Sequence, residues 1–70
     1  MSQVRAEMAA NVWKVLVSPG QSVVVGDELL VLESMKMEIP VVAEQAGTVA
    51  EVAVAEGAVV REDDLLVTLD

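Results

Sequence analysis

Residues 9–33 read AANVWKVLVSPGQSVVVGDELLVLE, and residues 46–70 read AGTVAEVAVAEGAVVREDDLLVTLD. Aligned without gaps at an offset of 37 residues, the two stretches are identical at nine of 25 positions. The identities least expected from a valine-rich composition are those of turn residues, namely Gly20 with Gly57 and Asp27 with Asp64. Because the same turn chemistry recurs at the same points, we interpret the stretches as two copies of one strand–turn–strand unit. Coincidence within a valine-rich chain is the alternative.

The apolar residues of this 70-residue chain are almost all aliphatic. Sixteen valines and seven leucines supply most of them, and Trp13 is the single aromatic residue. Branched side chains fit a pleated sheet, and alternating apolar residues predict strands within residues 11–17 and 47–54. The run at residues 29–33 is apolar on both faces, which is typical of a strand buried in a sandwich. The sequence therefore predicts one all-β domain, residues 1–70, built as a small sandwich or flattened barrel.

Charge and composition exclude several functions. Twelve acidic residues outnumber four basic ones, which gives a net charge of −8, and the basic residues are scattered singly. Because nucleic-acid binding needs clustered Lys and Arg, we expect no nucleic-acid partner. No apolar run approaches the ~20 residues of a membrane-spanning helix, and the first residues lack the apolar run of a signal peptide. We therefore expect no membrane partner and a cytoplasmic location.

The chain is also poor in catalytic and metal-binding side chains. It contains no Cys and no His, so it can form neither a disulfide nor the usual zinc clusters. Its serines have no histidine to activate them. The adjacent acids Asp27-Glu28 and Asp63-Asp64 lack the alternating oxygen ligands and central glycine of a calcium loop. We therefore expect no metal site and no catalysis by this chain alone.

One segment, residues 34–40, lies between the two copies of the repeat. Strand-like residues flank it on both sides, at 29–33 and 38–42. A tight hairpin here would carry Met35, Lys36 and Met37 at or near its tip. The turn lacks the Asn-Gly or Asp-Gly that such hairpins prefer, so we infer that something other than turn propensity selects its residues.

Lys36 offers chemistry at this tip. An amine on a long stem is accessible to the active site of another protein, and acylation would turn it into an amide-linked arm without charge. The flanking thioethers of Met35 and Met37 are soft and apolar, which suits docking into a groove. An ordinary surface lysine paired with Glu33 or Glu38 is the commoner explanation of such a residue on general grounds.

The hexapeptide ESMKME, residues 33–38, resembles the biotin-attachment motif of the biotinyl/lipoyl-domain family, in which a lysine lies between two methionines. The resemblance covers nearly the whole chain. In its length and motif the chain is similar to small stand-alone biotin carboxyl carrier proteins. It implies a flattened β-barrel of two four-stranded antiparallel sheets with quasi-twofold internal symmetry. The attachment lysine of that fold lies on an exposed hairpin between the halves, which agrees with the position of Lys36 in the repeat.

The resemblance also implies a function for each residue of the hexapeptide. Lys36 would be acylated with biotin by a biotin protein ligase and become a swinging arm. That arm would take a carboxyl group from a biotin carboxylase to a carboxyltransferase acting on an acyl-CoA or a 2-oxo acid. The chain itself would be a non-catalytic subunit. The remaining hairpin residues would serve recognition by the enzymes, with Met35 and Met37 as motif flanks and Glu33, Ser34 and Glu38 assisting the ligase.

Two alternatives share the implied fold. A lipoyl carrier is one, although its lysine usually follows Asp rather than Met. An unmodified interaction module of the same fold is the other.

The chain departs from the family pattern in its second half, where Asp63-Asp64 stands in place of the usual Gly-Asp, so we expect a strained turn. Ser34 stands where the family more often has Ala, and the chain has no room for the protruding loop of some bacterial carriers. Trp13 aligns with Ala50 in the repeat and breaks its symmetry. We interpret this tryptophan as a packing residue, ahead of a role in a partner surface.

Overall fold

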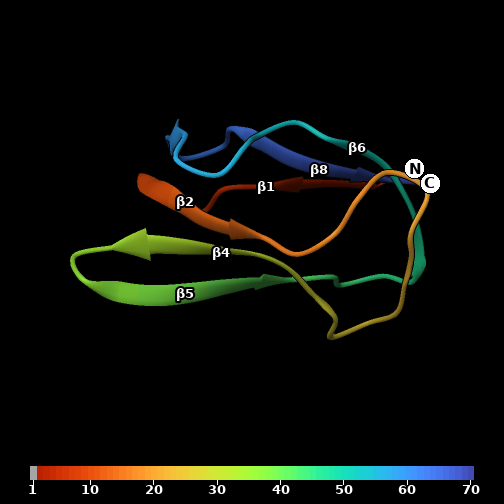
Figure 1. Cartoon of the computed structure of the whole chain (residues 1–70). Coiled ribbons are helices and arrows are strands. Elements are labelled where there is room, and N and C mark those ends of the chain that lie inside the picture. The colour runs from red at the N-terminus through yellow and green to blue at the C-terminus, as the bar shows by residue number, and fades with distance from the viewer. Residues whose placement is uncertain (1) are drawn as a thin grey trace.

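The computed structural model describes residues 2–70, and it consists of strands joined by turns (Figure 1). The strands in chain order are β1 (Ser2–Arg5), β2 (Ala10–Val15), β3 (Ser22–Val23), β4 (Glu28–Ser34), β5 (Met37–Val42), β6 (Gly47–Val52), β7 (Val59–Val60) and β8 (Leu65–Leu69). This confirms the predicted all-β class. The predicted domain also includes Met1, which lies outside the described residues.

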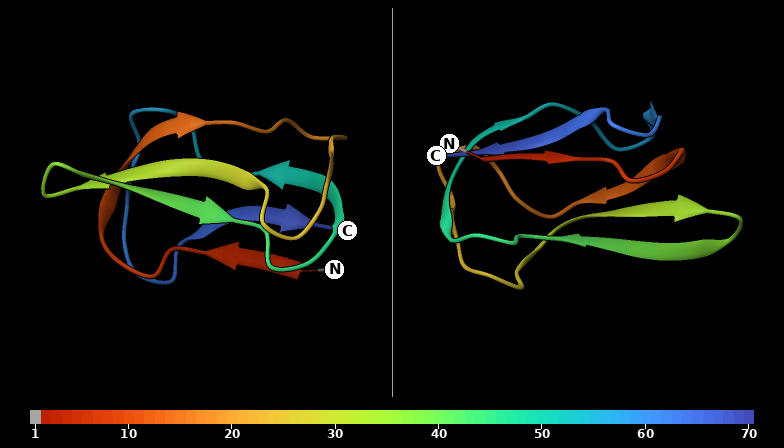
Figure 2. Two further views of the ribbon diagram at one scale, coloured as in Figure 1. Left: turned by 90° about the horizontal axis from the view of Figure 1, so that it is seen from below. Right: turned by 180° about the vertical axis from the view of Figure 1, so that it is seen from behind.

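The strands form two antiparallel sheets of four strands each, stacked as two layers (Figure 2). One sheet has the order β1-β8-β6-β3, and the other has the order β5-β4-β2-β7. Adding 37 to the residue numbers of β2 gives the bounds of β6, and the same operation converts β3 into β7. Each sheet is therefore the counterpart of the other, which confirms two four-stranded sheets related by quasi-twofold symmetry.

Hydrogen bonds between the halves follow the same symmetry. The amide of Gly20 donates to the carbonyl of Val49 at 2.7 Å, and the amide of Gly57 donates to the carbonyl of Val12 at 2.8 Å. Both glycines have left-handed backbone angles, with φ of 91° and 90°. Gly20 is the repeat partner of Gly57, and Val12 is the repeat partner of Val49. Each half therefore donates one of these hydrogen bonds to the other half and accepts the equivalent one from it. This agreement excludes coincidence as the origin of the repeat.

The repeated aspartates close the turns before β4 and β8. The Asp27 carboxylate accepts a hydrogen bond from the amide of Val24 at 2.9 Å, and the Asp64 carboxylate accepts one from the amide of Arg61 at 2.8 Å. A side-chain oxygen that bonds a nearby backbone amide in this way stabilises a tight turn. The sequence identity of these two positions thus has a structural cause.

Two matching β-bulges interrupt β2 and β6. The pairing register shifts between Val12 and Lys14 in β2 and between Val49 and Glu51 in β6, so Trp13 and Ala50 are the extra residues. An extra residue moves the next inward-facing position along by one. This explains why the inward valines are spaced by three and then by two along the sequence. The regular strands also end earlier than predicted, at residues 15 and 52 rather than at 17 and 54.

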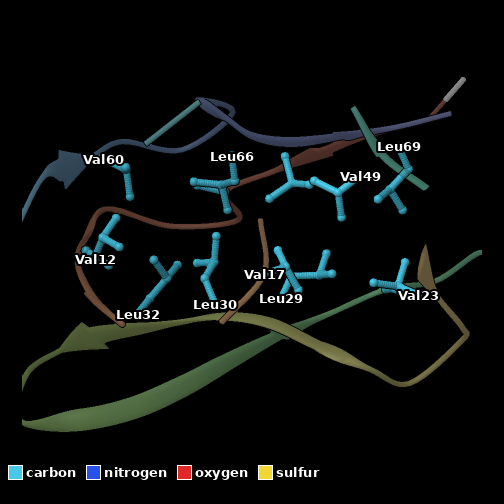
Figure 3. Packing of buried hydrophobic residues seen from close by; sticks show 14 residues of the cluster. Val12, Val17, Val23, Leu29, Leu30, Leu32, Val49, Val60, Leu66 and Leu69 are labelled. Atoms are coloured by element: carbon cyan, nitrogen blue, oxygen red, sulfur yellow. The ribbon is translucent and has the colours of Figure 1, made fainter. Parts of the chain in front are cut away.

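A single aliphatic core fills the space between the sheets (Figure 3). Leu29, Leu30 and Leu66 are fully buried in it. The prediction that β4 is buried on both faces was wrong, because Val31 is only half-buried and Glu33 is exposed. Leu29 and Leu30 are both buried because β4 has a bulge there, as β8 has at Leu66. The part of the chain that the structure describes, residues 2–70, contains no helix that could span a membrane.

The turn before β8 contains the predicted strain. Asp63 has a φ of 75°, in the left-handed region, where its repeat partner Gly26 has a φ of 93°. The two amides make equivalent bonds, to the carbonyls of Ala6 and Ala43 respectively. The backbone geometry of this turn is therefore preserved while the residue type is not, and an aspartate adopts a conformation that costs it more than it costs glycine.

We expect Asp63→Gly to stabilise the domain and Gly26→Asp to destabilise it. The free energy of unfolding should rise by about 1 kcal/mol in Asp63→Gly and fall by about 1 kcal/mol in Gly26→Asp, because the effect comes from the left-handed backbone alone. A Cβ at Gly26 would meet nothing within 4 Å, so no clash adds to the strain there. Thermal unfolding followed by circular dichroism measures both, with midpoint shifts of roughly 4–8 °C of opposite sign. Shifts of the same sign in the two variants would contradict the strain argument.

Candidate functional site

The hairpin between β4 and β5 has a two-residue turn. Ser34 is paired with Met37 across the ladder, which leaves Met35 and Lys36 as the central turn residues. Their φ angles are 53° and 65°. Two successive positive φ angles are those of a type I′ turn, whose twist matches that of the flanking strands. The predicted tip is therefore present, with Met37 as the first residue of β5.

This turn is formed by residues that do not favour it. Type I′ turns strongly prefer Asn-Gly, whereas a residue with a Cβ and a long side chain pays of order 1 kcal/mol in the left-handed region. The ladder between β4 and β5 extends from Glu28 opposite Val42 to Ser34 opposite Met37, and it holds the turn in place. Strain that the surrounding structure maintains is a feature of functional positions. It supports the inference that Met35 and Lys36 are selected for chemistry.

The tip is open to solvent at both central turn residues and at the first residue of β5. Met35 is 88% exposed and Met37 is 59% exposed, and Lys36 between them is exposed as well. Two hollows of about 350 and 250 Å³ flank β1, and neither is lined by any residue of the hexapeptide 33–38. The Lys36 amine is thus accessible to a second protein and is not enclosed in a pocket of its own, which is the geometry required of a covalent attachment point.

The other hexapeptide residues lie immediately behind the tip. Glu33 and Glu38 are directly opposite each other in the ladder and are both exposed. Like charges placed opposite one another destabilise a sheet, so this pair does not serve the fold. Ser34 is half-buried beside them. The structure therefore brings together all six residues that the sequence singled out. Among residues 2–70, no three acidic side chains are grouped so as to hold a metal ion.

Comparison with known families accounts for this geometry. The Biotin_lipoyl family model, described as "Biotin-requiring enzyme", matches residues 1–69. The chain belongs to this family. It is a biotin/lipoyl attachment domain, and the hairpin that carries Lys36 lies at the end of the domain opposite the N- and C-termini (Figure 1).

Two curated relatives are similar to this attachment domain over most of their own length. The biotin/lipoyl attachment protein of Bacillus subtilis (strain 168) is 50% identical over 66 residues, which are 94% of this chain and 90% of that protein. The biotinylated protein TB7.3 homolog of Mycobacterium leprae is also 50% identical over 66 residues, which are 94% of this chain and 93% of that protein.

Solved structures show the same fold in two settings. The Kluyveromyces lactis urea carboxylase matches with a TM-score of 0.92 and 28% identity, covering 99% of this chain but 6% of that enzyme. The lipoyl domain of the 2-oxoglutarate dehydrogenase complex from Azotobacter vinelandii matches with a TM-score of 0.83 and 26% identity, covering 97% and 94% of the two chains. The fold of the attachment domain is therefore common to both settings and does not by itself select the acyl group.

Sequence reasoning missed one exposed pair of residues in the attachment domain. Trp13 is 43% exposed and lies outside the core, so its interpretation as a packing residue was wrong. The Lys14 ammonium lies over the indole, 5.1 Å from the centroid of the ring. The bulge in β2 is the cause, because it exposes two successive residues on the outer face of the sheet. The break in the repeat at Trp13 was the only available signal.

Proposed function

We propose that Lys36 is acylated with biotin and that the domain is the carboxyl carrier of a biotin-dependent carboxylase. The observation that carries the proposal is the position of Lys36, exposed at the tip of a type I′ hairpin whose residues are poor formers of that turn. The second lysine of the chain, Lys14, lies within β2 and its ammonium contacts an indole. Of the two lysines, Lys36 is the one at a hairpin tip, which supports its assignment as the attachment point.

The attachment step uses one atom of this chain. In the active site of a biotin protein ligase, the deprotonated Nζ of Lys36 attacks the acyl carbon of biotinyl-adenylate. A C–N amide bond forms, and the C–O bond to AMP breaks with its electron pair leaving on AMP. One proton leaves the ammonium before the attack and a second leaves the nitrogen as the amide forms, and both pass to solvent or to the ligase. The lysine charge is lost, so the net charge becomes one unit more negative than −8.

After attachment, the residues of the chain hold and present the arm. Biotin on Lys36 supplies the carboxyl-group transfer between a biotin carboxylase and a carboxyltransferase acting on an acyl-CoA or a 2-oxo acid. The β4–β5 ladder fixes the base of the arm, while the exposed lysine side chain lies beyond it. Because the chain has no His, Cys or Tyr, we propose that the catalytic groups come from the partner enzymes.

A lipoyl group on Lys36 is the alternative, because the lipoyl domain named above shares the fold. The two methionines beside Lys36 favour biotin over lipoyl, since the biotin-attachment motif has a lysine between methionines.

We expect protein isolated from its native host to have the mass of the chain plus one biotinyl group. Intact-mass measurement followed by peptide sequencing identifies the group and places it on the peptide with Lys36. A lipoyl mass would transfer the assignment to the alternative, and an unmodified chain would contradict both.

A further inference from the structure

The two matching bulges differ in the residues that they expose. β2 presents Trp13 and Lys14, whereas the equivalent positions of β6 are Ala50 and Glu51. The same backbone geometry is thus formed with an alanine as with a tryptophan. The fold does not require a large aromatic side chain at this bulge, and Trp13 is 43% exposed and lies outside the core.

The tryptophan shares a face and a sheet with the attachment hairpin. In the ladder between β2 and β4, Asn11 is opposite Glu33 and Val12 is opposite Leu32. From these pairs and the usual strand spacing, Trp13 lies roughly 15 Å from Lys36. Val59 of the adjacent edge strand is paired with Asn11 and is 74% exposed. We call Trp13, Lys14 and Val59 the outer patch.

We propose that the outer patch is a docking surface for the biotin protein ligase that acylates Lys36. This inference rests on the proposed function. The ligase acts on the amine itself, which reaches only about 6 Å from the backbone, so its surface has to come close to the hairpin. A standard interface buries about 800 Å² on each partner. Centred on the tip, an interface of that size extends over the outer patch.

Enzymes that act on the loaded arm have a weaker need for this surface. They work at the end of an extended acyl-lysine, whose length of roughly 15 Å is more than twice that of the lysine alone. They can therefore engage the tip and leave the sheet face uncovered. This difference in reach is the reason for assigning the outer patch to the ligase.

Charge on this face defines the chemistry of the partner. Lys14 is one of four basic residues in a chain of net charge −8, and it orders the indole by lying over it. An apolar pocket with a carboxylate at its edge would accept the Trp13–Lys14 pair. Closer to the tip, basic groups on the partner would complement the exposed carboxylates of Glu33 and Glu38. Tryptophan is enriched among the residues that dominate binding energy, so Trp13 is the expected anchor.

The test compares steady-state acylation of unmodified carrier variants by purified biotin protein ligase with biotin and MgATP. The variant Trp13→Ala/Lys14→Glu copies the residues of the β6 bulge, so its fold is supported by the other half of the chain. We expect its KM for the carrier to rise about 30-fold, with kcat within about twofold, because anchor residues of an interface have effects of this size. The matched control is Leu16→Ala, which truncates a residue 45% exposed and further from the tip. Its KM should stay within about twofold of wild type.

A binding measurement separates docking from chemistry. Because Trp13 is the only tryptophan, 5-fluorotryptophan labelling gives the Lys36→Arg carrier a single ¹⁹F resonance. Adding ligase should shift or broaden it. If wild type is acylated on Lys36 but the double variant keeps the wild-type KM and the resonance does not change, the docking proposal is wrong and the proposed function stands. If wild type is not acylated at all, the proposed function fails first.

Discussion

Replacing Lys36 with arginine is expected to abolish acylation of the domain by the ligase. The same replacement at Lys14 is expected to leave the amount of biotin incorporated per mole of carrier unchanged when the carrier concentration saturates the ligase. Arginine keeps the positive charge and a similar length, but its guanidinium is not deprotonated in proteins and cannot act as the nucleophile. The left-handed backbone at residue 36 costs both side chains alike. The Lys36→Arg variant therefore removes the amine and leaves the hairpin intact.

Incorporation of labelled biotin, quantified per mole of carrier, measures this effect. Lys14→Arg makes the same chemical change at a lysine in β2. It serves as the control because arginine keeps the positive charge of Lys14 and saturating carrier compensates for any weaker docking. We expect incorporation in Lys36→Arg to fall to the background of a reaction without carrier. Label that persists in Lys36→Arg would place the attachment elsewhere.

Truncation of Leu66 to alanine is expected to have the largest effect on stability. Leu66 is fully buried at the bulge of β8, in the centre of the core (Figure 3). Leucine-to-alanine changes at such positions cost about 2–5 kcal/mol, from lost burial and from the cavity left behind. Small domains have about 0.05–0.15 kcal/mol of stability per residue, so the loss is a large part of the total.

Urea unfolding followed by circular dichroism gives the free energies to compare. The repeat partner, Leu29, is equally buried at the equivalent bulge of β4, so Leu29→Ala should cost nearly as much. Leu16→Ala, at a residue 45% exposed, should cost well under half of that. If Leu66→Ala were no more destabilising than Leu16→Ala, the central place of Leu66 in the core would be wrong, and a large difference between Leu66→Ala and Leu29→Ala would contradict the equivalence of the two halves.

The sequence predicted the halves of the fold because their turn residues are specific. Gly20 and Gly57 need left-handed backbones that few other residues adopt. β1, in contrast, was not predicted, since four residues of mixed polarity give no clear pattern. Extending the repeat by three residues, to Ala6 and Ala43, would have indicated it. Those two alanines are equivalent in the structure and make matching turn hydrogen bonds.

The bulges were not predictable from local pattern. A bulge is a mismatch in register between two strands that are distant in sequence, so it leaves no composition of its own. The spacing of valines by three at the bulges was its only trace. At the attachment site, the identity of Lys36 and its place at a tip were predictable from the hexapeptide. The exposure of Trp13 was not, because it depends on the bulge.

The opposite placement of the hairpin and the termini makes this domain a rigid spacer. Its long dimension is 31 Å, against 18 and 17 Å for the other two. The hairpin lies at one end of this dimension, and the start of β1, which is paired with the end of β8, lies at the other end (Figure 2). Any polypeptide joined at either terminus would hold the domain at one end while the reactive group works at the other. The range of a tethered carrier is then the sum of a flexible linker, a stiff body and a flexible arm. The stiff body adds reach without adding conformational entropy.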